Sequence, residues 1–154
     1  MGRRRRGRET ALKLLYALDL NPESPDDVLK ASWIDTVVPD GVREFSLTLV
    51  AGVMSHRDEI DALVKEWSMN WSLERIGAIE RNILRFAIYE LLFLTDIPPN
   101  VTINEAVEVA KRYGTNEAPS FINGILDRIK QEVGTRDGDG KQIAFSDLSH
   151  SPTA

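Results

Sequence analysis

The sequence predicts an all-α protein built from seven helices. Apolar residues recur every three or four positions along most of the chain, which is the spacing that gathers them on one face of a helix. No stretch alternates apolar and polar residues between turn signals for long enough to indicate a strand. The expected helices are joined by connections of a few residues, so neighbours must pack antiparallel. We therefore expect two small antiparallel helical subdomains that meet around the fifth helix.

The first two expected helices are separated by a proline. The first begins near Glu9 and ends before Pro22. Its apolar face has the spacing of a 3.6-residue period and consists of Leu12, Leu15, Tyr16 and Leu18. The second begins at Ser24 and Pro25, because serine can cap a helix and proline suits its first turn, and it stops before Pro39.

The third and fourth expected helices meet near residue 55. The apolar face of the third consists of Phe45, Leu49, Val50 and Val53. That of the fourth consists of Ile60, Leu63, Val64 and Trp67. Ser55 and Asp58 have the spacing of a capping pair, in which the first side chain caps the helix and the second reaches back to it. We therefore expect Ser55 to cap the fourth helix.

The fifth and sixth expected helices are separated by two prolines. The apolar face of the fifth consists of Ile76, Ile79, Ile83, Phe86 and Ala87. This helix ends near Pro98 and Pro99, which cannot continue it. Thr102 and Glu105 then have the spacing of a capping box, so we expect the sixth helix to open there. Gly114 ends it.

The seventh expected helix runs from about Pro119 to Val133, after which the composition changes. Residues 135–154 are rich in glycine, aspartate and serine and hold only scattered apolar residues, a composition that cannot bury a core. The chain before them is long enough and apolar enough for one folded domain. We therefore expect one folded helical domain over residues 1–134 and a disordered tail over residues 135–154.

Several function classes are excluded by what the sequence lacks. With no cysteine and two histidines, it has few parts for a metal cluster or a nucleophile relay. It has no glycine-rich phosphate-binding loop, no secretory signal, and no apolar run of the roughly 18 residues that a membrane span needs. We therefore expect a cytoplasmic protein that is not an enzyme, uses no cofactor or metal and has no membrane partner.

Positive charge is concentrated at the N-terminus, where five arginines stand at Arg3, Arg4, Arg5, Arg6 and Arg8. The net charge of the whole chain is −5, and without these five residues 14 basic side chains face 24 acidic ones, a net charge of −10. A cationic edge on an anionic body indicates polyanion binding at one place. The same cluster is also compatible with a flexible arm that aids solubility.

The position of the arginines favours RNA as the polyanion. They run directly into the first helix, which carries Tyr16 about two turns after Glu9. Arginine can grip two phosphate oxygens or stack on an unpaired base, as binding of single-stranded RNA requires. Phe121 has two interpretations that stay open: its helical spacing suits the core, but an exposed aromatic ring near a basic strip is a stacking platform.

Five segments of the chain carry a family resemblance. In chain order they read GRETALKLLYALDL, LVAGVMSHRDEIDALV, AIERNILRFAIYELLF, IPPNVTINEAVEVAKRYG and FINGILDRI. Together they resemble the NusB family of bacterial transcription antitermination factors, and the resemblance covers roughly residues 3–129. It implies a fold of seven helices in two subdomains.

The resemblance also implies a function and partners. NusB-like proteins bind the single-stranded boxA element of ribosomal RNA leaders as a heterodimer with NusE, a small-subunit ribosomal protein. Together with the other Nus factors they help RNA polymerase to read through terminators. We therefore expect a transcription antitermination factor with boxA RNA and NusE as direct partners, and with the other Nus factors and RNA polymerase as indirect ones.

The residues that the resemblance assigns to these surfaces match positions of this chain. For RNA they are Arg3, Arg4, Arg5, Arg6, Arg8, Lys111, Glu117 and Phe121. For the surface that NusE and RNA share they are Tyr16 and Glu80. The chain departs from the family at Ser120, where relatives often carry lysine, and at Glu80 and Glu117, where aspartate is common.

Two other interpretations remain open. One is a self-associating helical protein whose homodimer masks the RNA surface, since some NusB relatives form such dimers. The other is a stand-alone relative of the RNA-binding module of ribosomal-RNA cytosine methyltransferases. We expect no methyltransferase activity, because no methyltransferase domain follows the helical one in this sequence.

Overall fold

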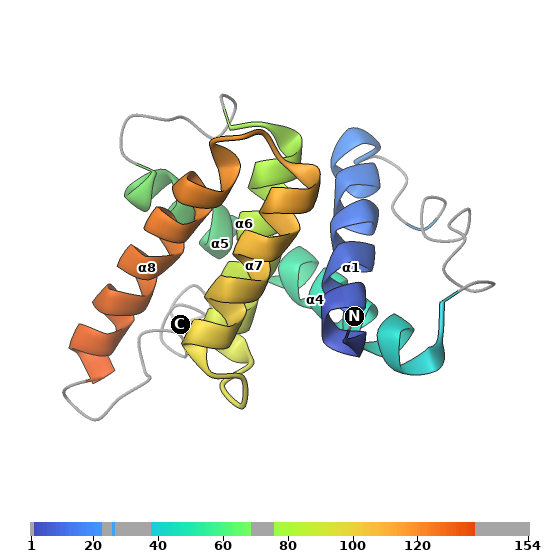
Figure 1. Cartoon of the computed structure of the whole chain (residues 1–154), viewed down its shortest axis with the longest axis horizontal. Helices are drawn as coiled ribbons and strands as arrows, with labels where there is room; N and C mark the ends of the chain where they lie inside the picture. The colour runs from blue at the N-terminus through green and yellow to red at the C-terminus, as the bar shows by residue number, and fades with distance from the viewer. Residues whose placement is uncertain (1, 23–25, 27–37, 69–75, 138–154) are drawn as a thin grey trace.

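A computed structural model describes residues 2–22, 26, 38–68 and 76–137. Its helices are α1 (Arg3–Leu20), α4 (Asp40–Ser55), α5 (Arg57–Trp67), α6 (Ala78–Phe93), α7 (Pro99–Tyr113) and α8 (Ala118–Asp137) (Figure 1). All regular structure in these ranges is helical, which confirms the all-α class. None of these helices is long and apolar enough to cross a bilayer. The second expected helix falls almost entirely outside the described residues.

Helix α6 lies at the centre of the fold and contacts α1, α4, α5, α7 and α8 (Figure 1). Helices α1 and α4 form one packed pair, and α7 and α8 form another. The middle of α6 is buried on nearly every side, with Ile83, Leu84, Phe86, Ala87 and Ile88 in the core. Because α6 is shared by both pairs, it holds the start of α1 in a defined position relative to α7 and α8.

The start of α7 differs from the one that the capping-box pattern predicts. The helix begins at Pro99 with Pro98 at its N-cap, ahead of Thr102. Proline suits the first helical position because it has no N–H to leave unsatisfied and its φ is already helical. The side chains of Thr102 and Glu105 bind other helices: Thr102 donates a hydrogen bond to Glu90 of α6, and Glu105 pairs with arginine of α1.

The predicted cap at Ser55 is also wrong. Helix α4 continues through Ser55, and His56 alone forms the corner before α5, with no side-chain hydrogen bond at the cap. The His56 ring stacks on Phe93, with 4.2 Å between ring centroids, so aromatic packing against α6 places the corner. At the other end of the chain, α8 continues past residue 134 to Asp137. The remainder of the expected tail lies outside the described residues.

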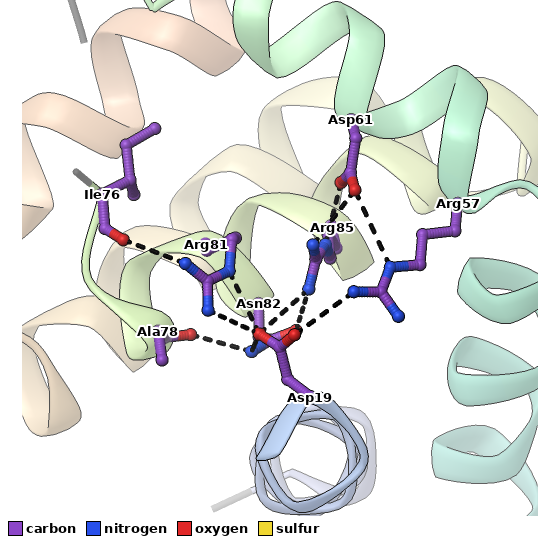
Figure 2. A network of polar contacts seen from close by, with 8 residues as sticks. All are labelled: Asp19, Arg57, Asp61, Ile76, Ala78, Arg81, Asn82 and Arg85. Carbon is purple, nitrogen blue, oxygen red and sulfur yellow. Dashed lines mark hydrogen bonds and ion pairs between the residues drawn. The ribbon is translucent and has the colours of Figure 1, made fainter. Parts of the chain in front are cut away.

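The C-terminal end of α1 is attached to α5 and α6 by a network of charged side chains (Figure 2). Asp19 accepts hydrogen bonds from Arg57, Arg81, Asn82 and Arg85 at 2.7 to 3.2 Å. Arg85 also forms two hydrogen bonds to Asp61, at 2.8 and 3.0 Å. Burial acts to raise the pKa of Asp19, but the hydrogen bond from Arg81 and the charges of Arg85 and Arg81 outweigh it and lower that pKa.

Candidate nucleic-acid interface

The structure divides the five N-terminal arginines into two groups. Arg3, Arg4 and Arg6 are exposed on the first turns of α1, whereas Arg5 is half-buried and Arg8 is buried. This division follows helix geometry, since positions 5 and 8 are three apart and lie on the side of α1 that faces α7. The exposed group is available to a ligand.

Arg8 is engaged in a buried ion pair with Glu90. Its side chain is 2% exposed and that of Glu90 is 0% exposed. The guanidinium donates two hydrogen bonds, each 2.7 Å long, to the two carboxylate oxygens. Thr102 donates a third hydrogen bond to the same carboxylate at 3.0 Å. This geometry satisfies both buried charges, so Arg8 attaches α1 to α6 and α7 and is not presented at the surface.

Arg5 makes a similar pair with Glu105 at the edge of the core. Both hydrogen bonds are 2.8 Å long, and the side chains are 34% and 21% exposed. The hydrogen bond from Arg5 lowers the pKa of Glu105, and the charges of Arg5 and Arg8 add to this effect against the opposing influence of burial. The two pairs together hold the first two turns of α1 against the rest of the protein.

A hollow of about 500 Å³ lies beside the arginines, between the start of α1 and the start of α7. It is lined by Gly2, Arg4, Arg5, Arg8, Asp96, Ile97, Pro98, Val101 and Glu105. On the α4 side, the Arg4 guanidinium lies over the ring of Phe45, 4.9 Å from its centroid. This contact limits the motion of an exposed cation while leaving its edge able to donate hydrogen bonds.

A second hollow, of about 480 Å³, brings together three of the residues that the sequence predicts for the site. Glu80, Glu117 and Phe121 line it with Ile76, Gly77, Thr115 and Ala118. Glu80 is largely buried and accepts a hydrogen bond from the backbone N–H of Thr115 at 3.0 Å, whereas Glu117 is exposed. Phe121 is half-buried: it packs against the core, as its helical spacing predicts, and it also lines the hollow. Its role as a stacking platform stays a prediction.

The two hollows lie at opposite ends of α7, since Pro98 lines the first and Thr115 the second. A helix of 15 residues spans roughly 22 Å at 1.5 Å per residue. Near the C-terminal end of α7, Glu9 of α1 accepts hydrogen bonds from Arg112 at 3.4 Å and from the Tyr113 hydroxyl at 3.3 Å. The predicted site residues are therefore spread between these two hollows, from the start of α1 to Glu80 of α6 and Phe121 of α8, and do not form a single pocket. We call this stretch the track.

Two further site residues lie along the flanks of this track. Lys111 is exposed on α7 and forms an ion pair with Glu108 at 3.0 Å. Tyr16 is 37% exposed on α1, and Leu20 of the same helix is 60% exposed. The exposed part of α1 thus changes from cationic at its start to apolar at its end.

Sequence reasoning missed the acidic partners of the arginines. Glu90 stands in the apolar stretch AIYELLF, where a charged residue requires a partner if the helix is buried. That signal indicated a buried ion pair but could not indicate which arginine completes it. Among the described residues, no group of three or more His, Asp or Glu side chains is arranged to hold a metal ion.

The fold and these surfaces define the class: an all-helical domain with a basic helix start and an aromatic-lined hollow along one track. The model of the NusB family matches residues 5–131. A transcription antitermination protein NusB from Desulfitobacterium hafniense is 45% identical over 148 residues, covering 94% of this chain and 99% of the relative. NusB from Geobacter sulfurreducens is 50% identical over 131 residues, covering 84% and 94%. The chain belongs to the NusB family, whose members are antitermination factors and not enzymes.

Solved structures show the same similarity. T. maritima NusB superposes with a TM-score of 0.76 at 40% identity, covering 84% of this chain and 91% of that one. A chain from the crystal structure of antitermination factors NusB and NusE in complex with dsRNA has a TM-score of 0.74 at 32% identity, covering 86% and 99%. The family resemblance noted in the sequence is therefore confirmed.

Proposed function

We propose that this protein binds single-stranded boxA RNA of ribosomal RNA leaders together with NusE, and so promotes read-through by RNA polymerase. The observation that carries the proposal is the anchored basic helix start. Arg3 and Arg6 form no ion pair with another described residue, while Arg5 and Arg8 hold the backbone beneath them. Cations on a fixed helix lose little conformational freedom when they bind phosphate.

The two ends of the track suit different parts of an RNA strand. The exposed arginines would bind phosphates, because phosphate contacts position a strand without reading its sequence. The second hollow would receive bases: Phe121 offers a stacking surface, and Glu80 and Glu117 can accept hydrogen bonds from base amino groups. This division supports recognition of a single strand, whose bases are free to turn outwards.

Charge explains why a partner is required. If Arg3, Arg4 and Arg6 each neutralised one phosphate, log affinity would fall with log salt at a slope of about −2, from roughly −0.7 per contact on a single strand. The acidic remainder of the chain repels RNA at long range, so the protein alone should bind modestly. NusE would supply further surface, as the similar structure that contains NusB, NusE and dsRNA suggests.

The apolar residues exposed on α1 and α4 support binding of a protein partner. They are also compatible with a second candidate function, self-association. Tyr16, Leu20, Leu47 and Met54 are the large apolar side chains exposed on α1 and α4. They would contribute to binding NusE, with Glu80 beside the RNA. The same surface suits self-association, in which a homodimer would mask the RNA track. Sedimentation at several protein concentrations, with and without RNA, distinguishes an RNA-binding monomer from such a homodimer.

We place the protein in the cytoplasm, with the other Nus factors and RNA polymerase as indirect partners.

The proposal is tested by fluorescence-anisotropy titration of labelled boxA RNA and a scrambled RNA of equal length, with and without purified NusE, over a series of salt concentrations. Tighter binding to boxA that NusE strengthens is the expected result. Equal and weak binding to both RNAs, unaffected by NusE, would overturn it.

A further inference from the structure

We propose that the RNA path continues past Phe121 into a second nucleotide subsite between α5 and α8, formed by Trp67, Phe121 and Arg128. A hollow of about 180 Å³ lies there. It is lined by Trp67, Ser68, Ser120, Phe121, Gly124, Ile125 and Arg128. The inference rests on the proposed RNA function and extends it, because none of Trp67, Gly124 and Arg128 belongs to the track described above.

Phe121 connects the two hollows. It lines the larger one with Glu80 and Glu117, and it lines the smaller one with Trp67 and Arg128. Helix α8 forms the edge of the molecule farthest from α1, and α5 packs against it (Figure 1). Because the two hollows share Phe121, an RNA strand that occupies the larger hollow at this residue would next reach the smaller one.

The two aromatic rings are held in place by the core. Trp67 and Phe121 are both half-buried, pack against the buried apolar cluster and line the hollow. Rings fixed in this way bind bases at little entropic cost, and every base has a π-face to stack on them. The subsite should therefore accept any unpaired nucleotide with little preference for its base.

Charge separates the roles of the two hollows. The larger contains the carboxylates of Glu80 and Glu117, which repel phosphate. The smaller contains Arg128 and no carboxylate among its lining residues. Arg128 is exposed and forms no ion pair with a described residue, and its neighbour Asp127 instead accepts a hydrogen bond from Gln131 at 2.9 Å. An RNA strand would suit both hollows if it placed a base in the larger one, away from phosphate, and its next phosphate against the Arg128 guanidinium in the smaller one.

Gly124 allows the subsite to be blocked without damage to the fold. A Cβ at this position would have no heavy atom within 4 Å, so a side chain there projects into open space. The Gly124→Gln substitution should fill the hollow. Because glycine weakens helices, this substitution should also stabilise α8 slightly. Gly124→Ala is the matched control, since it changes the backbone preference while filling little of the hollow.

The test measures binding of boxA RNA flanked by three unstructured nucleotides on each side, and of the same RNA trimmed to its core. We expect Arg128→Ala and Gly124→Gln to weaken binding of the flanked RNA about five-fold or more, the loss expected for one stacked nucleotide or one phosphate contact. Gly124→Ala should bind as the unaltered protein does. So should Lys65→Ala, which removes an exposed charge of α5 outside the hollow.

The outcomes separate this inference from the proposed function. Unchanged binding by Arg128→Ala and Gly124→Gln, with binding still dependent on Arg3, Arg4 and Arg6, would overturn the subsite and leave the proposed function standing. Binding that depends on neither group would overturn both. A direct readout uses Trp33→Phe and Trp71→Phe, which leave Trp67 as the sole tryptophan. Flanked RNA should then quench the emission of Trp67, and unchanged emission at saturation would also overturn the subsite.

Discussion

Arg8 of α1 and Glu90 of α6 form a two-pronged ion pair inside the protein, with both N–O distances at 2.7 Å. The residues are 82 positions apart in the chain, and Thr102 of α7 completes the coordination of the carboxylate. The pair thus joins three helices directly beneath the exposed arginines. Its presence explains how a run of like charges can begin a rigid helix and not a loose arm.

Breaking this pair from one side should destabilise the fold. Arg8→Ala leaves Glu90 buried without its counter-ion, so the free energy of unfolding should fall by about 3–5 kcal/mol. Denaturant titration followed by circular dichroism measures this. The control replaces both partners, Arg8→Met with Glu90→Leu, and should recover much of the loss, because an apolar pair leaves no charge buried. A double variant as unstable as the single one would contradict the argument.

The exposed arginines should affect RNA binding and not stability. We expect the slope of log affinity against log salt concentration to become less negative by about 2 when Arg3, Arg4 and Arg6 are replaced with alanine. The melting temperature should stay nearly unchanged, because these side chains are exposed and the ion pairs of Arg5 and Arg8 remain. Lysine at the same three positions keeps the charge and should retain most of the salt dependence. Retained affinity in the alanine variant would refute their role.

Stability should fall in acid through Asp19. Its pKa is lower in the folded protein than the ordinary value of 3.8, so its ionised form stabilises the fold above that pH. This contribution is lost as the pH falls from about 3.8 through the folded pKa, because the proton removes the pairing with Arg81 and Arg85. Asp19→Asn should therefore be less stable than the unaltered protein at neutral pH, with a difference that narrows in acid.

Urea titrations from pH 6 to pH 2.5 measure this narrowing. Asp127→Asn is the matched control, since Asp127 has a single hydrogen bond to Gln131 at the surface. A constant difference between the Asp19 variant and the unaltered protein at all pH values would show that the carboxylate charge is not the source of the stabilisation.

Gly52 should not tolerate a side chain. A Cβ at Gly52 would overlap the ring of Tyr89, which covers this turn of α4. Gly52→Ala should therefore lower the free energy of unfolding by about 1–3 kcal/mol, the range for overpacking a filled core, even though alanine favours helices. Gly124→Ala, in open space on α8, should be neutral or slightly stabilising. Thermal melts of the two variants compare them directly, and equal effects would refute the steric account.

Helical spacing in the sequence predicts most of the core correctly. Leu12, Leu15 and Leu18 of the first expected helix are buried, as are Ile83 and Phe86 of the central one. This success has a local cause, since residues three and four apart share a helix face whatever the rest of the chain does. Helix ends were predicted less well. The N-cap of α7 is Pro98 and not Thr102, and that of α5 is His56 and not Ser55. Contacts with α6 decide these positions, and the local sequence does not reveal them.

The sequence alone was enough to determine the all-helical class, the cationic N-terminus and the family. Tertiary packing decided which arginines remain exposed, that Glu80 and Glu117 share a hollow with Phe121, and that Phe121 lines a second hollow with Trp67 and Arg128. The physical reason is that an ion pair or a hollow joins side chains from helices far apart in the chain. The spacing of these side chains in the sequence carries no information about their contact, because that contact depends on how the helices pack against one another.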